Sequence, residues 1–274
     1  MIRRFPLFRL SLLRRRRMLL ALLVGMVVFE ALIVVVAGTL SPAQLFAGGG
    51  GRAPAGAFQA FSGSSGRVSI ASYPGLLGAG LVHPFWIAIQ LTAVGSLGAA
   101  AVAADAEAGT LELLMVRPVS RARLLGERTA ALLAVALLLN LAATLTVAAG
   151  VALTPAVHAD VPLTGVWVAG LLGFGFSLCM TGPALAVSAL ARGRAQVLGA
   201  VIAFGAVGFA LNFLALAWRP AAPLRHLSPF HYYAPGDALA TATVPWGALG
   251  LLTLVGAAGI AVAFAAFTRR DLTG

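Results

Sequence analysis

The acidic residues of this chain are concentrated in one short segment, DAEAGTLELLMVRPVSRARLLGER, at positions 105–128. Asp105, Glu107, Glu112 and Glu127 are four of the chain's eight acidic residues, and four of its nineteen arginines lie in the same segment. The segment separates two long apolar runs, and no grouping of Ser, His and Asp suggests hydrolysis. We therefore expect these charges to form a surface on which another protein docks.

A second candidate is Glu30, near the middle of the apolar run MVVFEALIV. A carboxylate exposed to lipid there costs about 3 kcal/mol, so Glu30 should face the bundle, a water path or a partner, or be protonated. Two hypotheses follow. Glu30 is a functional acid such as a proton relay, or it is a neutral acid bonded to one of the other polar residues within the apolar runs, which are Gln90, Asn140 and Asn212.

Several kinds of chemistry are excluded by the residues that the chain lacks. There is no lysine, so neither a Walker A loop nor a Schiff-base mechanism is available in standard form. The single cysteine, Cys179, permits no intramolecular disulfide and no thiol-rich metal site. His226, His231 and Asp237 lack a spacing that would hold a metal on one helix face. We expect no catalytic, cofactor or metal site, and any nucleotide must be bound by another subunit.

The apolar runs indicate the fold class. Of the residues, 60% are hydrophobic and 10% are charged, whereas soluble domains average about 25% charged. A helix needs about 20 apolar residues to cross a bilayer, and continuous runs of this length predict helices, whereas barrel strands alternate. We predict an all-α bundle of six transmembrane helices, at approximately 18–40, 81–104, 124–147, 165–190, 197–218 and 246–267.

The distribution of arginine predicts the orientation of this bundle. Fifteen of the nineteen arginines fall on the side that holds both chain ends and the segment 105–128. This positive-inside pattern places both termini in the cytoplasm, and it explains the net charge of +11 without nucleic acid. Heavy use of alanine, glycine and arginine is typical of a GC-rich bacterial genome. We expect a multi-pass protein of the bacterial inner (cell) membrane.

The chain shows no domain boundary, so residues 1–274 are predicted to form one membrane domain. Residues 1–17 are basic and form either an interfacial helix on anionic lipid or a simple topology anchor. Residues 41–80 are rich in Gly, Ser and Ala and are expected to form a flexible outer loop. Residues 219–245 form a second outer loop, with Tyr233 among the aromatic residues expected at the membrane surface.

The segment 105–123 is predicted to be a cytoplasmic elbow between the second and third spans. Leu111, Leu114 and Met115 lie on one face of a short helix. Pro118 ends that helix, and Ser120 is placed to cap the helix that enters the third span. Such an elbow could transmit a push from a partner to two membrane helices.

The run EAGTLELLMVRPVSR resembles the signature of permease subunits of type-2 ABC transporters. The matching positions are Glu107, 109–114 and 117–121, and a Leu-Ser-Pro-Phe stretch at 227–230 precedes the last span as it does in the family. Such permeases often carry a lysine shortly after the elbow, where this chain has Glu127 and Arg128. The specific motif covers about 20 residues, and the general organisation covers most of the chain.

The resemblance implies a transport subunit of an ATP-driven exporter, without enzymatic activity of its own. The elbow would be a coupling helix that docks on a separate ABC ATPase, present in two copies, which binds ATP and Mg²⁺. A second permease, identical or paralogous, would complete the transporter. Leu111 and Leu114 would fill the partner's groove, and Glu112 and Arg121 would set its electrostatic register. The expected coupling residues are Glu107, Gly109, Thr110, Leu111, Glu112, Leu114, Arg117, Pro118 and Arg121.

Two alternatives remain from other classes. One is a proton-coupled secondary transporter that uses Glu30, for which Glu30→Gln should abolish transport and changes at Leu111 should be mild. The other is a non-transporting membrane scaffold or assembly factor that uses the elbow for docking. Vectorial movement of a solute in vesicles would exclude the scaffold.

Overall fold

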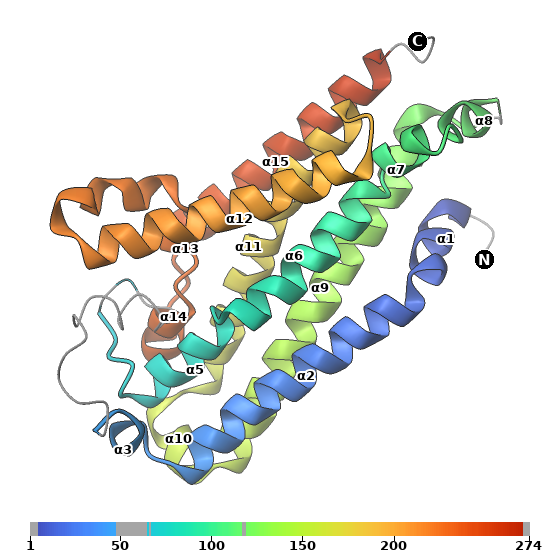
Figure 1. The fold of residues 1–274 in the computed structure, drawn as a ribbon. Coiled ribbons are helices and arrows are strands. Elements are labelled where there is room, and N and C mark those ends of the chain that lie inside the picture. Colours follow the sequence, from blue (N-terminus) through green and yellow to red (C-terminus); the bar gives the residue numbers. More distant parts are fainter. Residues whose placement is uncertain (1–4, 48–64, 66, 117–118, 271–274) are drawn as a thin grey trace.

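The computed structural model describes residues 5–47, 65, 67–116 and 119–270, and every regular element in these ranges is a helix (Figure 1). Six spans in them are long and apolar enough to cross a membrane, as the sequence predicts. They are α2 (Arg16–Thr39), α5 with α6 (Tyr73–Leu81 and Pro84–Ala99), α9 (Arg121–Leu153), α11 (Leu163–Leu190), α12 (Arg194–Ala217) and α15 (Trp246–Arg269). The shorter helices are α1 (Pro6–Arg14), α3 (Pro42–Ala47), α7 (Ala103–Glu107), α8 (Leu111–Met115), α10 (Pro155–Asp160), η1 (Arg219–Leu227), α13 (Pro229–Tyr232) and α14 (Pro235–Thr241).

Helix α11 is the centre of the bundle and packs against α6, α9, α12, α14 and α15. Its approach to α15 is close enough for backbones to touch. A Cβ atom added to Gly182 would lie 2.3 Å from the carbonyl oxygen of Gly256, so only glycine fits there. Small residues at helix crossings permit this close packing in membrane proteins, where no hydrophobic effect drives helices together.

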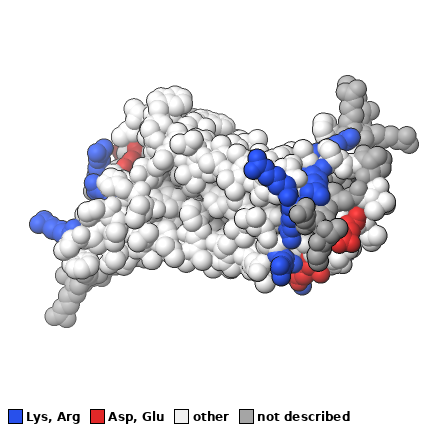
Figure 2. Space-filling view, turned by 90° about the horizontal axis from the view of Figure 1, so that it is seen from above, with Lys and Arg blue, Asp and Glu red and all other residues white. Residues whose placement is uncertain are grey.

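Charged side chains gather at the two ends of the molecule, and the body between them carries almost none (Figure 2). We call the end formed by α1, α7, α8 and the last turn of α15 the elbow end, because it holds the segment 105–123. The opposite end is formed by α3, α10 and η1 (Figure 1). An apolar body between two charged ends is the surface that a bilayer requires.

The second span differs from the helix expected at about 81–104, because it begins earlier and is interrupted. It consists of α5 and α6, and the chain breaks between them at Val82 and His83. Pro84 explains the break, because proline at the first position starts a helix and the residue before it avoids the α conformation. The loop expected at 41–80 therefore has helices at both ends, α3 and most of α5, while 48–64 and 66 lie outside the described residues.

The segment 219–245 also differs from the expected surface loop. It contains η1, α13 and α14, and it inserts Tyr233 into the bundle. The ring of Tyr233 stacks on Trp86 and Phe176 with centroid distances of 5.3 and 4.8 Å, and its hydroxyl donates to the carbonyl of Leu81 at 3.0 Å. The expectation that Tyr233 lies in an interfacial belt is wrong, since a ring whose hydroxyl finds a partner is stable in a core.

Candidate functional site

The elbow consists of two short helices, α7 and α8, where the sequence predicts one. The chain turns at Gly109, which has a left-handed φ of 64°. Its N–H donates to the carbonyl of Ala106, and the next N–H, of Thr110, donates to that of Asp105. A left-handed glycine after the last helical residues is a common helix ending, and here it ends α7 well before Pro118.

The second half of the elbow is partly described. Arg117 and Pro118 lie outside the described residues, so the expected proline break is not seen. Ser120 caps α9 as predicted, because its Oγ accepts a hydrogen bond from the N–H of Arg123 at 3.2 Å. Helix α9 then runs without interruption from Arg121 to Leu153.

The face that the elbow exposes is not the expected one. Leu111 is only 4% exposed and belongs to the core, and Leu114 packs against that core. The residues that project outward are Glu112, Leu113 and Val116. Leu113 is 69% exposed and Val116 is 86% exposed, three residues apart and thus on one face of the helix. In this structure Leu111 and Leu114 attach the elbow to its own bundle, whereas the sequence predicts that they fill a partner's groove.

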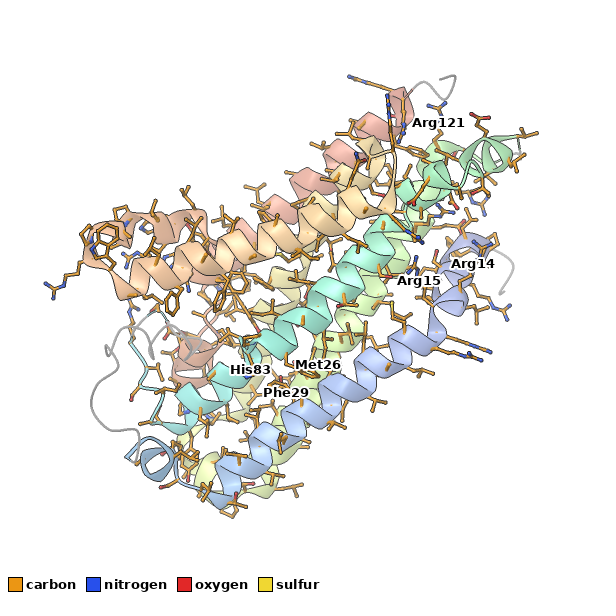
Figure 3. All side chains as sticks on the ribbon, viewed as in Figure 1. Arg14, Arg15, Met26, Phe29, His83 and Arg121 are labelled. Atoms are coloured by element: carbon orange, nitrogen blue, oxygen red, sulfur yellow. The ribbon has the colours of Figure 1, made fainter. Side chains whose placement is uncertain are left out.

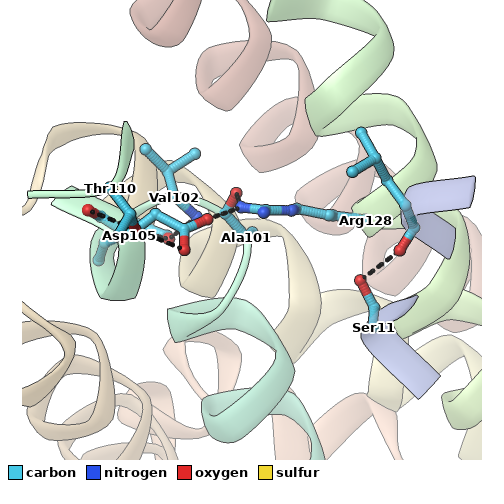
Figure 4. A network of polar contacts seen from close by, with 9 residues as sticks. Ser11, Ala101, Val102, Asp105, Thr110 and Arg128 are labelled. Atoms are coloured by element: carbon cyan, nitrogen blue, oxygen red, sulfur yellow. Dashed lines mark hydrogen bonds and ion pairs between the residues drawn. The ribbon is translucent and has the colours of Figure 1, made fainter. Parts of the chain in front are cut away.

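A polar network fixes the base of the elbow (Figure 4). One carboxylate oxygen of Asp105 forms an ion pair of 2.5 Å with Arg128, and the other accepts from the Thr110 hydroxyl at 3.2 Å. Arg128 also donates to the carbonyl of Ala101 at 2.9 Å. Arg128 is 9% exposed, so the pair is largely removed from water, and loss of either partner would leave a buried charge.

Two glutamates link this region to the first turns of other helices. Glu107 accepts from the backbone N–H of Arg194, the first residue of α12, at 2.8 Å. Glu127 accepts from the N–H groups of Leu7 and Phe8, in the first turn of α1, at 2.8 and 3.2 Å. Free N–H groups and the helix dipole favour negative charge at these positions, so each carboxylate acts as a helix cap supplied by another segment.

Arginine side chains satisfy the carbonyl ends of two long helices in the same way. Arg121 donates to the carbonyls of Thr268 and Arg270 at the end of α15, at 3.2 and 2.5 Å (Figure 3). Arg270 donates to the carbonyls of Ala189 and Ala191 at the end of α11, at 2.9 and 3.1 Å. Arg121 was expected to face a partner, and the structure places its guanidinium within its own chain.

Sequence reasoning missed one further contact. The hydroxyl of Ser188, in α11, accepts from the N–H groups of Val102 and Ala103 at 3.1 and 3.2 Å. These N–H groups begin α7 and would otherwise be unpaired in a buried position. The sequence around a serine in the last turn of an apolar helix does not show that its hydroxyl will cap the start of another helix.

The polar residues inside the bundle divide into two groups. Ser177 accepts from the Asn140 amide at 2.9 Å and donates to Gln90 at 3.2 Å, and this chain joins α6, α9 and α11. Glu30 is fully buried, and its oxygens have no hydrogen-bond partner among the described residues. Neither oxygen therefore bonds to Gln90, Asn140 or Asn212, which was one of the two hypotheses for this residue. In the described ranges, no group of three or more His, Cys, Asp or Glu could hold a metal ion.

A comparison with curated proteins finds no match. A comparison with protein families matches residues 10–272 to the model described as "ABC-2 family transporter protein". The match begins in α1 and includes all six spans and the elbow. The chain therefore belongs to the ABC-2 transporter family and is a membrane-spanning permease subunit.

Proposed function

We propose that this permease is driven by a separate ATPase that docks on the exposed face of α8, and that it exports its substrate with both termini in the cytoplasm. The observation that carries the proposal is the pair Leu113 and Val116, apolar residues that project at the elbow end beside Glu112. Exposed apolar side chains next to a charge are typical of a protein interface. Family membership supports an ABC ATPase as the partner.

The contacts at the base of the elbow suggest how movement would reach the membrane. The Asp105–Arg128 pair joins α7 to α9, Glu107 joins α7 to α12, and Ser188 joins α7 to α11. A displacement of α8 would therefore act on three spans at once through short, partly buried polar contacts. In this proposal Glu107, Thr110 and Leu111 keep the elbow rigid, and Glu112, Leu113 and Val116 contact the partner.

The assembly we propose has two copies of the ATPase and two permeases, the second identical or paralogous. ATP and Mg²⁺ would bind to the ATPase, since this chain has no lysine for a Walker A loop. Fifteen of nineteen arginines on the elbow side support a cytoplasmic location for that end in the bacterial inner membrane.

Photo-crosslinking in native membranes tests the docking face. In a Cys179→Ser background, Leu113→Cys and Val116→Cys would each carry a maleimide photo-crosslinker, and captured proteins would be identified by mass spectrometry. We expect both positions to capture an ATPase with a Walker A loop. Leu138→Cys is the matched control, because Leu138 is also an exposed leucine but lies within α9.

A second variant tests whether the captured contact is functional. Leu113→Asp with Val116→Asp should abolish permease-stimulated ATP hydrolysis and leave the melting temperature unchanged, because neither side chain is buried. Full stimulation by this variant would contradict docking on α8. Transport that persists without any ATPase would instead favour a proton-coupled mechanism, and a captured partner without vectorial transport would favour a scaffold.

A further inference from the structure

A cavity of about 250 Å³ lies at the elbow end, between α1, the end of α6, α7 and α9. Its charged lining consists of Arg14, Arg15, Arg128 and Asp105, and Leu7 and Leu10 are among its other lining residues. Arg14 and Arg15 follow one another where α1 meets α2 (Figure 3). We call this the arginine cavity.

The arginine cavity contains more positive than negative charge. Its carboxylate, Asp105, is already paired with Arg128 at 2.5 Å and bonded to Thr110. Arg15 donates to Ser96 Oγ, which is neutral, and Arg14 has no ion pair or hydrogen bond from its side chain to any residue in the described part of the chain. Two guanidinium groups therefore remain without an anion.

Neighbouring carboxylates do not supply the missing charge. Glu127 forms an ion pair with Arg123 and accepts hydrogen bonds from the N–H groups of Leu7 and Phe8. Glu107 forms an ion pair with the Arg194 guanidinium and accepts from the Arg194 N–H. Partial burial, and to a smaller extent repulsion from the Arg194 guanidinium, lower the pKa of Arg15. A bound anion would offset both effects.

The shape and position of the cavity indicate which anion. Guanidinium groups present a planar fork of donors that matches the oxygens of a phosphate. Helix α2 begins at Arg16 and is apolar from Met18 to Gly38 except for the buried Glu30, so the cavity lies at the end of this span where it would meet the bilayer surface. Phospholipid phosphates occupy this level, and Leu7 and Leu10 offer apolar contact beside the charges. We propose that the arginine cavity binds a phosphate group, carried by an anionic phospholipid or by free phosphate.

A phosphate at this position would connect two parts of the elbow end. On one side it would contact Arg14 and Arg15, at the junction of α1 and α2. On the other it would lie beside the Asp105–Arg128 pair at the base of the elbow. Binding would therefore stabilise the present position of α7, and this consequence for transport rests on the proposed function. The binding site itself does not depend on it.

Binding is tested on the purified full-length chain with dioctanoyl phosphatidylglycerol, which is soluble and anionic, and with dioctanoyl phosphatidylcholine as the zwitterionic control. Native mass spectrometry would count bound lipid for wild type, Arg14→Gln, Arg15→Gln and the double variant. We expect the double variant to bind phosphatidylglycerol at least about ten-fold more weakly. The matched control is Arg16→Gln with Arg17→Gln, which removes the same charge from adjacent exposed residues outside the cavity, and its binding should stay within about two-fold.

Equal losses in the two double variants would overturn the proposal, because the attraction would then be general electrostatics. No loss in Arg14→Gln with Arg15→Gln would overturn it as well. Inorganic phosphate identifies the source: competition at millimolar concentration would support free phosphate, and its failure to compete would support a lipid headgroup. Arg14→Gln alone guards against misfolding, since the Arg14 side chain has no hydrogen bond or ion pair in the described part of the chain that the change would remove. An ATPase that still docks on α8 in these variants would separate this proposal from the proposed function.

Discussion

Gly109 sets the angle between the two halves of the elbow through its left-handed φ of 64°. Nothing lies within 4 Å of a Cβ atom added there, so Gly109→Ala introduces backbone strain without a clash. We expect a cost of about 1–2 kcal/mol. Amide hydrogen exchange at Gly109 and Thr110, whose N–H groups close the turn, should then accelerate by roughly five-fold or more.

Asparagine at the same position provides the control for that experiment. Asn tolerates the left-handed region better than alanine, so Gly109→Asn should accelerate exchange less than Gly109→Ala. Equal exchange rates in wild type and Gly109→Ala would show that the turn does not need its present conformation.

Glu30 is the residue whose chemistry a conservative change tests most directly. It is fully buried in α2, and neither of its oxygens has a hydrogen-bond partner in the described part of the chain. Glu30→Gln keeps the size of the side chain and removes the ionisable group. We therefore expect the free energy of unfolding to fall by no more than about 1.5 kcal/mol. The ATPase activity of the assembled transporter should stay close to that of wild type. Glu30→Ala should be less stable by about 2–4 kcal/mol, because it leaves a cavity.

The two Glu30 variants distinguish packing from chemistry. Loss of activity in Glu30→Gln at an unchanged melting temperature would contradict a purely structural role and would support proton coupling through this carboxylate. Unfolding of both variants would instead assign Glu30 a structural contact within the transporter.

At the residue scale, the sequence predicted local chemistry better than orientation. The cap at Ser120 could be predicted because a serine side chain reaches the third N–H of its own helix. The inward position of Leu111 and the outward one of Leu113 could not be predicted. In a five-residue helix both faces carry leucine, and only the position of the helix on the bundle decides which face is buried.

Glu127 is a polar link between α9 and α1, because it accepts from the N–H groups of Leu7 and Phe8. Glu127→Ala leaves both N–H groups without an acceptor, at a cost of about 1–3 kcal/mol. We expect α1 to separate more often from α9 and trypsin to cleave faster after Arg9 and Arg14. N-terminal sequencing of early fragments would measure this.

The control for the α1 experiment is Arg123→Gln, which removes a largely exposed partner of Glu127 and keeps the bonds to α1. The Arg123 side chain is 52% exposed, and Glu127 keeps its two N–H donors in this variant, so cleavage should change less than in Glu127→Ala. Rapid cleavage in both variants would show that α1 is held by the arginine as much as by the carboxylate.

At the element scale, apolar length predicted all six spans, because the bilayer sets the same minimum for each of them. The breaks between and beyond the spans were harder to predict. The break at Val82 follows from Pro84, a signal that is visible in the sequence. Tyr233 inserts between α6 and α11 because it stacks on Trp86 and Phe176, which are 147 and 57 residues away in sequence. No local sequence pattern predicts such a contact.

For the whole molecule, α1, the elbow helices α7 and α8 and the end of α15 lie at one end of the six spans, and the family places the chain in a membrane. The distribution of positive charge then predicts on which side of the membrane the elbow end lies. The positive-inside rule predicts a cytoplasmic elbow end, because arginine near short loops resists translocation. An ATPase can reach α8 only if this orientation is correct.

Cysteine labelling in intact cells tests the orientation, with Cys179→Ser as the unlabelled background. Ala159→Cys lies in α10 at the opposite end, Ala108→Cys lies at the end of α7, and both alanines are exposed. We expect a membrane-impermeant maleimide to label Ala159→Cys in intact cells and Ala108→Cys only after permeabilisation. The reverse pattern would place α8 outside the cell, where no ATP is available to a docked ATPase, and would contradict both the charge rule for this chain and the proposed coupling.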